Sequence, residues 1–110
     1  MLESRIYVGL DDKDTHEQSL DTEEYKSILR SICKDYKTSF SLQVIEGGYF
    51  HDDGSWVEEN SLLVTLIGTP RKTVYSIAKK LCKYFNQESV MITGSSVLKF
   101  NVCDHQEDEE

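Results

Sequence analysis

Residues 47–60 read Gly-Gly-Tyr-Phe-His-Asp-Asp-Gly-Ser-Trp-Val-Glu-Glu-Asn, and a run of strand character lies on either side of them. Asp-Gly between two such runs predicts a β-hairpin, because a two-residue type I′ loop needs positive φ at both positions and glycine adopts it freely. We therefore predict Asp53-Gly54 as the loop. The cross-strand pairs are then Phe50 with Val57, Tyr49 with Glu58, and His51 with Trp56.

Farther from the loop, a different register fits the apolar pattern better. The alternating residues Phe40, Leu42 and Val44 match Leu62, Val64 and Leu66 in a pairing shifted by one residue. Bulges absorb one extra residue and often carry glycine in a left-handed conformation. We therefore predict a β-bulge at Gly47-Gly48, where it would re-aim the side chains beside the loop.

Hydrophobic periodicity places the other elements. Alternation predicts strands at residues 5–10, 40–46 and 62–67, and two extended segments at 88–93 and 97–102 separated by Gly94-Ser95-Ser96. Apolar residues at helical spacing predict helices at 21–37 and 70–86. For the first helix we predict an Asp21 N-cap with Glu24 and a staple between Leu20 and Tyr25. For the second we predict a Thr69 N-cap with Pro70 in the first turn.

The order strand, helix, strand, strand, helix, strand predicts an α+β fold, the ferredoxin-like βαββαβ sandwich. Its antiparallel sheet carries both helices on one face and a long hairpin between the second and third strands. We expect one domain over residues 1–103 and a disordered acidic tail at 104–110. The uncovered sheet face then carries mostly apolar side chains and predicts a partner: Tyr7, Gln43, Ile45, Leu63 and Ile67.

Charge is distributed unevenly along these 110 residues. The net charge is −8, with −6 in residues 11–24 and −5 in 104–110, so the remainder of the chain carries +3. Acidic blocks are usually solvated, and the alternative is that they imitate a nucleic-acid backbone toward a basic partner. Five outward-facing bases on the second helix predict a solvated face, so we do not expect direct nucleic-acid binding: Arg71, Lys72, Lys79, Lys80 and Lys83.

The three cysteines are widely spaced, and Cys33 and Cys82 lie on apolar helix faces. Free buried thiols fit a reducing compartment, so we expect a cytoplasmic protein. We expect no membrane association, because no apolar run approaches the roughly 20 residues of a membrane span. The pattern predicts no cofactor and no metal site, since the acids near the hairpin do not have the spacing of converging ligands.

Several short motifs resemble those of a family of short bacterial proteins of unassigned function. They are Tyr7-Val8-Gly9-Leu10, the hairpin segment from Gly47 to Trp56, residues 58–61, and Phe85-Asn86-Gln87-Glu88-Ser89-Val90. The similarity covers about residues 5–102. It implies the same fold and a site near Trp56 and Gln87, and it implies no activity.

Trp56 is the centre of the predicted binding site, either as an exposed anchor or as a plug over the end of the sheet. The predicted binding residues are Tyr49, His51, Trp56, Glu58, Glu59 and Gln87. No motif predicts a reaction, and we assign no catalytic residue.

Three functions fit this sequence. The first is a non-catalytic protein that self-associates, as a dimer or larger, or binds a protein partner or nucleotide ligand through the open sheet face and hairpin. The second is an acidic, phage-type counter-defence inhibitor that blocks a nucleic-acid site or sequesters a signalling nucleotide. The third is a small ferredoxin-like enzyme with a histidine or glutamate on the hairpin.

Overall fold

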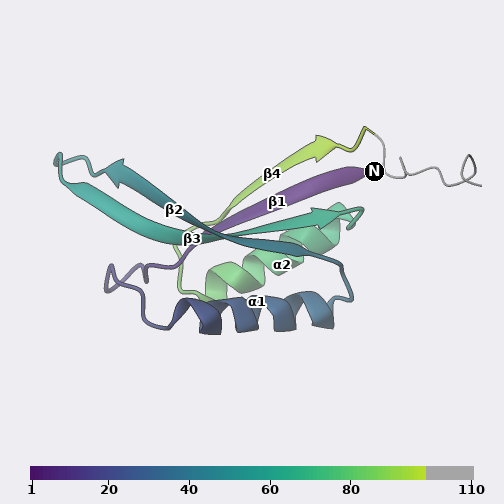
Figure 1. The fold of residues 1–110 in the computed structure, drawn as a ribbon, viewed down its shortest axis with the longest axis horizontal. Coiled ribbons are helices and arrows are strands. Elements are labelled where there is room, and N and C mark those ends of the chain that lie inside the picture. Colours follow the sequence, from purple (N-terminus) through teal and green to yellow (C-terminus); the bar gives the residue numbers. More distant parts are fainter. Residues whose placement is uncertain (99–110) are drawn as a thin grey trace, which may run out of the picture.

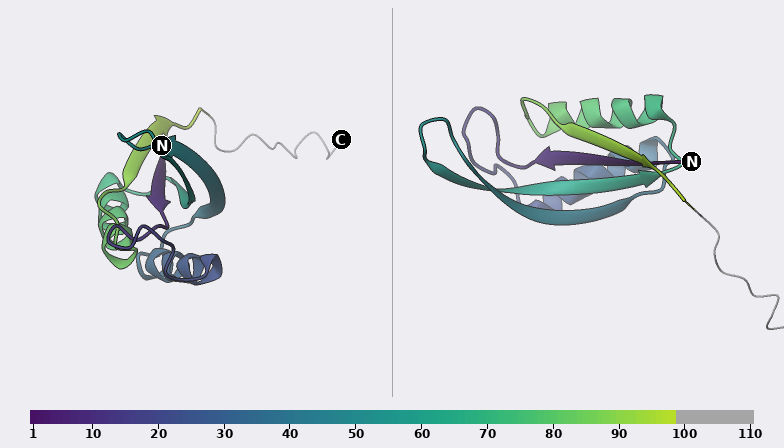
Figure 2. Two further views of the ribbon diagram at one scale, coloured as in Figure 1. Left: turned by 90° about the vertical axis from the view of Figure 1, so that its left-hand side faces the viewer. Right: turned by 90° about the horizontal axis from the view of Figure 1, so that it is seen from above.

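A computed structural model describes residues 1–98 of the chain (Figure 1). The elements in order are β1 (Leu2–Gly9), α1 (Thr22–Asp35), β2 (Ser41–Phe50), β3 (Trp56–Ile67), α2 (Arg71–Tyr84) and β4 (Met91–Ser96). The strands form one antiparallel sheet in the order β2-β3-β1-β4. Both helices lie on the same face of this sheet (Figures 1 and 2). The predicted ferredoxin-like βαββαβ fold is confirmed.

The core lies between the sheet and the two helices. Strand residues contribute through strict alternation, and helix residues contribute through a stripe at i, i+3 and i+4 spacing. Burying them stabilises the fold by roughly 1.5–3 kcal/mol for each large side chain. The fully buried members are Ile6, Val8, Leu10, Leu29, Cys33, Leu62, Val64, Leu66, Ile77 and Leu81.

The opposite sheet face has no helix over it among residues 1–98. Tyr7, Gln43 and Leu63 pair across three neighbouring strands on this face. Tyr7, Leu63 and Ile45 are partly buried, and Ile67 is 43% exposed. β3 is therefore apolar on both faces over Leu62–Ile67, as the sequence predicts.

The loop of the β2–β3 hairpin differs from the prediction. The His51 N–H donates to the Ser55 carbonyl at 2.8 Å, and the Gly54 N–H donates to the His51 carbonyl at 2.9 Å. Gly54 has φ 87°, whereas Asp53 is not among the residues with positive φ. The loop is therefore a three-residue connection ending in a left-handed glycine, and the predicted two-residue type I′ loop is wrong.

The extra loop residue shifts every predicted hairpin pair by one position. Phe50 pairs with Trp56 and Tyr49 with Val57. Gly47 pairs with Glu59 and Gly48 with Glu58 in an unbroken register, so the predicted bulge is absent. The longer loop supplies the shift that the bulge was invoked to explain.

Each helix ends in the same way. Lys37 (φ 54°) and Asn86 (φ 48°) follow α1 and α2 in a left-handed conformation. The next N–H bonds back to the helix in both cases, from Thr38 to the Cys33 carbonyl at 3.1 Å and from Gln87 to the Cys82 carbonyl at 2.9 Å. These are Schellman caps, which usually place glycine or asparagine at the left-handed residue.

The helix starts are only partly as predicted. Asp21 is the N-cap of α1, but its side chain makes no capping hydrogen bond. The Tyr25 hydroxyl accepts the N–H of Ser19 and of Leu20, both at 3.2 Å, while the Leu20 side chain is 40% exposed. α2 begins one residue later than predicted, with Pro70 as its N-cap.

Thr69 is therefore not the N-cap of α2. Its buried hydroxyl instead hydrogen-bonds the Thr38 hydroxyl at 2.6 Å, which ties the end of α1 to the start of α2.

All four predicted strands have different bounds in the structure, with β2 extending to Phe50 and β3 starting at Trp56. β1 starts at Leu2 rather than at residue 5, and β4 runs through Gly94-Ser95-Ser96, which was predicted as a separator. Residues 99–102 of the second extended segment, Cys103 and the predicted tail 104–110 lie outside the described residues. No helix within residues 1–98 is long and apolar enough to cross a membrane.

Candidate functional site

The candidate site begins at Gly9, where β1 ends. A Cβ at this position would lie 2.6 Å from Oε2 of Glu59 and 3.0 Å from Oε1 of Gln87. Glu59 comes from β3, and Gln87 comes from the turn after α2. A glycine in a strand often marks a close approach of this kind. Gly9 thus lets two polar side chains from distant parts of the chain converge.

Glu59 is a partly buried carboxylate. Its Oε2 accepts the backbone N–H of Asp11 at 3.0 Å. No Lys, Arg or His within residues 1–98 forms an ion pair with it. Burial raises the pKa of Glu59 above its usual value, and the negative charge of Asp11 adds to the rise while the Asp11 N–H opposes it. An electrostatically unpaired carboxylate of this kind is suited to a cationic ligand.

Gln87 presents an acceptor to the same place. Its Nε2 donates to the Asp11 carbonyl at 2.6 Å and to the Phe85 carbonyl at 3.2 Å. Two carbonyl partners fix the orientation of the amide, because only its nitrogen can donate to them. Oε1 therefore faces Gly9 beside the Glu59 carboxylate.

These groups lie in a groove of about 530 Å³, which we call the sheet-side groove. Tyr7, Ser61 and Met91 place it on the face opposite the helices, since they alternate with core residues. It is lined by Tyr7, Gly9, Asp11, Asp12, Lys13, His16, Tyr49, His51, Val57, Glu59, Ser61, Gln87, Glu88, Ser89 and Met91. Four of these residues are acids, and Lys13 is already paired with Asp14 at 3.2 Å. The groove therefore favours positive ligands.

The opposite side of the hairpin holds a second concavity of about 470 Å³, which we call the Trp56 hollow. The indole ring lies against Gly48, where a Cβ would overlap it. Its Nε1 donates to Oε1 of Glu58 at 3.1 Å, and the Phe50 ring meets it edge-on at 5.0 Å. Trp56 is 54% exposed, so it does not fill the core.

The six predicted binding residues thus divide between two faces of the hairpin. Tyr49, His51, Glu59 and Gln87 line the sheet-side groove, and the Tyr49 and His51 rings meet edge-on at 5.4 Å. Trp56, Glu58 and Glu59 line the Trp56 hollow. Phe50, not His51, lies opposite Trp56.

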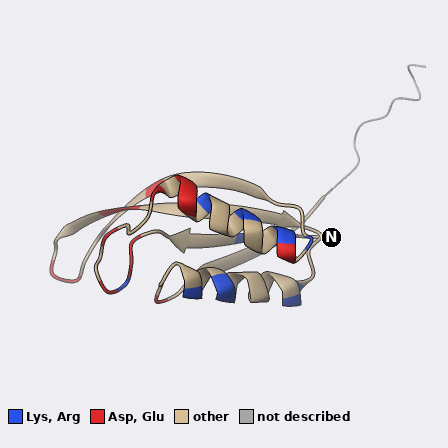
Figure 3. Cartoon of the chain, turned by 90° about the horizontal axis from the view of Figure 1, so that it is seen from below, with Lys and Arg blue, Asp and Glu red and all other residues tan. Residues whose placement is uncertain are grey.

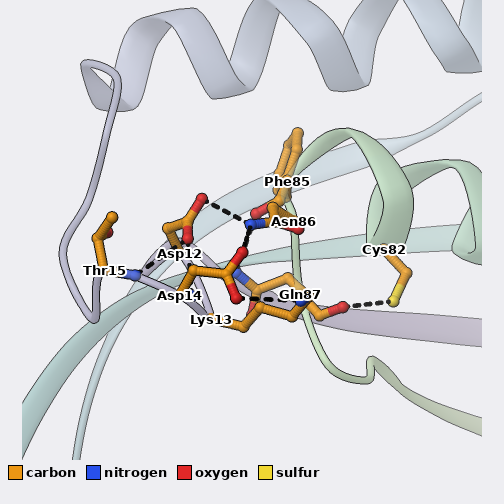
Figure 4. A network of polar contacts seen from close by, with 8 residues as sticks. All are labelled: Asp12, Lys13, Asp14, Thr15, Cys82, Phe85, Asn86 and Gln87. Atoms are coloured by element: carbon orange, nitrogen blue, oxygen red, sulfur yellow. Dashed lines mark hydrogen bonds and ion pairs between the residues drawn. The ribbon is translucent and has the colours of Figure 1, made fainter.

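Sequence reasoning missed several residues of the groove. Asp11 donates to Glu59 in the groove. Asn86, which does not line the groove, holds the acidic loop through Asp12 and Asp14 (Figure 4), and only the tertiary fold brings these residues together. The glycine at the end of an alternating strand was the available signal for Gly9.

Charge separates the groove end of the molecule from α2 (Figure 3). Acids gather in the 11–17 loop and on the hairpin, whereas α2 has five bases and no acid. Lys80 lies 5.0 Å from the centre of the Tyr36 ring.

Within residues 1–98 no three His, Cys, Asp or Glu side chains are grouped closely enough to hold a metal ion.

The chain is similar to a phage SAM lyase. Aligned with that enzyme in complex with S-methyl-5′-thioadenosine, it is 25% identical, with a TM-score of 0.65 over 86% of this chain and 79% of the lyase chain. The ligand-free lyase gives 27% identity and a TM-score of 0.66 over 86% and 78%.

A more distant likeness concerns the fold alone. CutA1 from Pyrococcus horikoshii is 13% identical, with a TM-score of 0.58 over 93% of this chain and 88% of CutA1. No protein-family model and no curated protein matches the sequence. The predicted resemblance to short bacterial proteins of unassigned function therefore has no matching family model.

Proposed function

We propose that the sheet-side groove binds S-adenosylmethionine and that the chain cleaves it as a lyase, releasing S-methyl-5′-thioadenosine. The observation that carries this proposal is the convergence of Glu59 and Gln87 over Gly9, inside an acidic groove. It is supported by the 25–27% identity to phage SAM lyase structures. These observations favour the two alternatives, a phage-type inhibitor that sequesters a signalling nucleotide and a small ferredoxin-like enzyme with a glutamate on the hairpin, over a non-catalytic binding protein.

The charged end of the ligand matches the two converging side chains. S-adenosylmethionine carries a positive sulfonium and an α-ammonium group with three N–H donors. Within residues 1–98 the second carboxylate oxygen of Glu59 accepts no hydrogen bond, and Gln87 presents Oε1, so both of these oxygen atoms can accept from the ligand. Hydrogen bonds from a cation to a carboxylate are about twice as strong as neutral ones.

The adenosine end matches the aromatic side of the groove. Tyr7, Tyr49 and His51 line it and are at least partly exposed. Stacking on an aromatic ring contributes roughly 1–3 kcal/mol for each base. We propose that the adenine base packs against these rings while the sulfonium lies near Glu59.

The reaction needs no group from the protein to form a bond. A carboxylate oxygen of the ligand attacks its own Cγ, the Cγ–S bond breaks, and the electron pair passes to sulfur. The sulfonium becomes the neutral thioether of S-methyl-5′-thioadenosine, and the remainder closes to homoserine lactone. No proton moves, and no water enters. Elimination would need a base for the unactivated Cβ proton, so we favour the intramolecular route.

The protein then acts by binding and orientation. Glu59 and Gln87 hold the cationic end so that the carboxylate and Cγ are near attack distance, and partial burial limits competing water. Glu59 is a binding group in this scheme and takes up no proton.

Product analysis tests the proposal. Purified protein incubated with S-adenosylmethionine should yield S-methyl-5′-thioadenosine and homoserine lactone by liquid chromatography with mass spectrometry. Glu59→Gln should lower kcat/KM by about 10–100-fold, the cost of a charged hydrogen bond. Asp52→Asn, at the exposed hairpin tip and outside both concavities, controls for the change in net charge. Absence of both binding and turnover would refute the proposal.

We also propose that the chain self-associates through its open sheet face. Ile45, Leu63 and Ile67, which do not line the groove, form an apolar surface there, and apolar patches of this kind commonly mark interfaces. Light scattering at micromolar concentration should report a dimer or larger, and a monomer would refute this.

A further inference from the structure

We propose that the side-chain amide of Asn86 is a positioning group that clamps the acidic 11–17 loop against the turn carrying Gln87, and thereby sets the geometry of the sheet-side groove. This inference rests on the proposed function, because its functional readout is ligand binding in that groove.

The clamp consists of one amide and two carboxylates. Nδ2 of Asn86 donates to Oδ2 of Asp12 at 2.9 Å and to Oδ2 of Asp14 at 2.9 Å (Figure 4). The backbone adds a third contact, since the Lys13 N–H donates to the Asn86 carbonyl at 3.0 Å. Both amide protons are thus used on one loop, 72 and 74 positions away in the sequence.

Asp12 also organises the inside of the loop. Its Oδ1 accepts the N–H of Asp14 at 2.8 Å and of Thr15 at 3.2 Å, while its own N–H donates to the Glu17 carbonyl at 2.8 Å. One carboxylate oxygen therefore folds the loop, and the other attaches it to Asn86. The hydrogen bond from Asn86 is the largest cause of the lowered pKa of both Asp12 and Asp14. The lowered pKa keeps the two carboxylates charged although they lie beside each other.

The position of the loop determines the position of the binding groups. Asp11 precedes the clamped residues, and its carbonyl accepts from Gln87 while its N–H donates to Glu59. Asp12, Lys13 and His16 of the same loop line the groove directly. If the loop moves away from Asn86, Asp11 moves with it, and both converging acceptors lose a partner.

The left-handed backbone conformation at position 86 does not by itself require an asparagine side chain. Asn86 occupies the left-handed position of a helix cap, where glycine is at least as favourable. Lys37 occupies the equivalent position after α1, away from the groove, and its side chain makes no hydrogen bond within residues 1–98. Both residues occupy the left-handed position of a helix cap, so comparing substitutions at the two positions isolates the effect of the Asn86 side-chain amide.

The experiment compares Asn86→Gly with Lys37→Gly in the full chain. Both substitutions suit a left-handed residue, so any loss of melting temperature in Asn86→Gly beyond that in Lys37→Gly comes from the lost amide hydrogen bonds. Calorimetric titration with S-methyl-5′-thioadenosine should show affinity reduced roughly tenfold in Asn86→Gly and unchanged in Lys37→Gly, because Asp12, Lys13 and His16, which line the groove, move with the released loop. KM for S-adenosylmethionine should rise more than kcat falls. Amide hydrogen exchange at residues 11–17 should accelerate only in Asn86→Gly.

Asn86→Asp provides a second variant. It tolerates the same backbone conformation but sets a third carboxylate against Asp12 and Asp14, so it should accelerate loop exchange further than Asn86→Gly.

The possible outcomes separate the two proposals. Wild-type affinity and loop exchange in Asn86→Gly would overturn the clamp and leave the proposed function intact. If the wild-type protein binds neither nucleoside, the proposed function fails, and the exchange measurement still decides whether Asn86 holds the loop. Equal effects in Asn86→Gly and Lys37→Gly would assign both to helix capping and overturn the clamp.

Discussion

Replacement of Gly9 by alanine should damage the sheet-side groove without disturbing the strand around it. The new methyl group would lie 2.6 Å from Oε2 of Glu59 and 3.0 Å from Oε1 of Gln87, so one or both side chains must move. Gly9 is not among the glycines with positive φ, and alanine can therefore adopt its backbone conformation. Any effect then comes from the displaced side chains.

Two opposing contributions set the size of the stability change. Alanine reduces the entropy of the unfolded chain, which stabilises the protein by about 0.4–1 kcal/mol. Displacing Glu59 removes its hydrogen bond to the Asp11 N–H, and a bond to a charged group contributes about 1.5–3 kcal/mol. We expect a net loss of about 1–2 kcal/mol, measured by urea unfolding. Affinity for S-adenosylmethionine should fall at least about tenfold, because both acceptors for its cationic end shift.

Gly47→Ala is the matched control in the same sheet. Its Cβ would meet only the Glu59 carbonyl oxygen, at an ordinary 3.8 Å. This variant should be as stable as the wild type or slightly more stable, with unchanged affinity. If Gly9→Ala matches it in both measurements, Glu59 and Gln87 do not converge over Gly9 and the site is wrong.

Two further predictions concern the hairpin and pH. Trp56→Ala should cost roughly 2 kcal/mol in thermal or urea unfolding, about half the 3–5 kcal/mol of a core aromatic, since the ring is 54% exposed; a full core-sized loss would contradict its placement. Because burial raises the pKa of Glu59 above its usual 4.5, this group is protonated at a higher pH than in the unfolded chain. The contribution of Glu59 to the free energy of unfolding therefore weakens as pH rises through the range between its unfolded and folded pKa values. Affinity for S-adenosylmethionine, measured by calorimetry, should fall as pH drops through the same range. The affinity of Glu59→Gln should not change with pH there.

The fold was accessible from sequence because the core obeys two simple periods. Ile6 and Val8 alternate with Tyr7, and the stripes of the two helices fall at 3.6-residue spacing. These patterns fix which face of each element is buried. Together with the handedness of the connections, they leave few topologies.

The hairpin register was not accessible in the same way. A glycine at position 54 suits a two-residue loop and a three-residue loop equally, because both require a left-handed residue there. The alternation of Leu42 and Val44 against Val64 and Leu62 indicated the correct pairing. Invoking a bulge at Gly47-Gly48 misassigned the cause, since Gly48 makes room for the Trp56 ring.

The groove depends on contacts that local sequence does not contain. Asn86 and Asp12 are 74 positions apart, and Gln87 and Asp11 are 76 apart. Composition indicated an acidic loop and a polar turn separately. Their meeting follows from β1 and α2 ending at the same side of the sandwich, which only the assembled fold specifies.

The β2–β3 ribbon projects past the ends of both helices (Figure 1), so its outer half has no helical layer beneath it. Segments with few buried contacts open at the lowest free energy. Tyr49 and His51 lie on this outer half, whereas Glu59 and Gln87 are tied to Asp11 at its base. Glu59 and Gln87 thus form a rigid part of the groove, whereas Tyr49 and His51 form a part that moves more easily. Binding of a nucleoside would restrict the motion of Tyr49 and His51, and this loss of conformational entropy would reduce the affinity. A covalent crosslink across the hairpin loop would restrict the same motion before binding, so it should tighten binding without contacting the ligand.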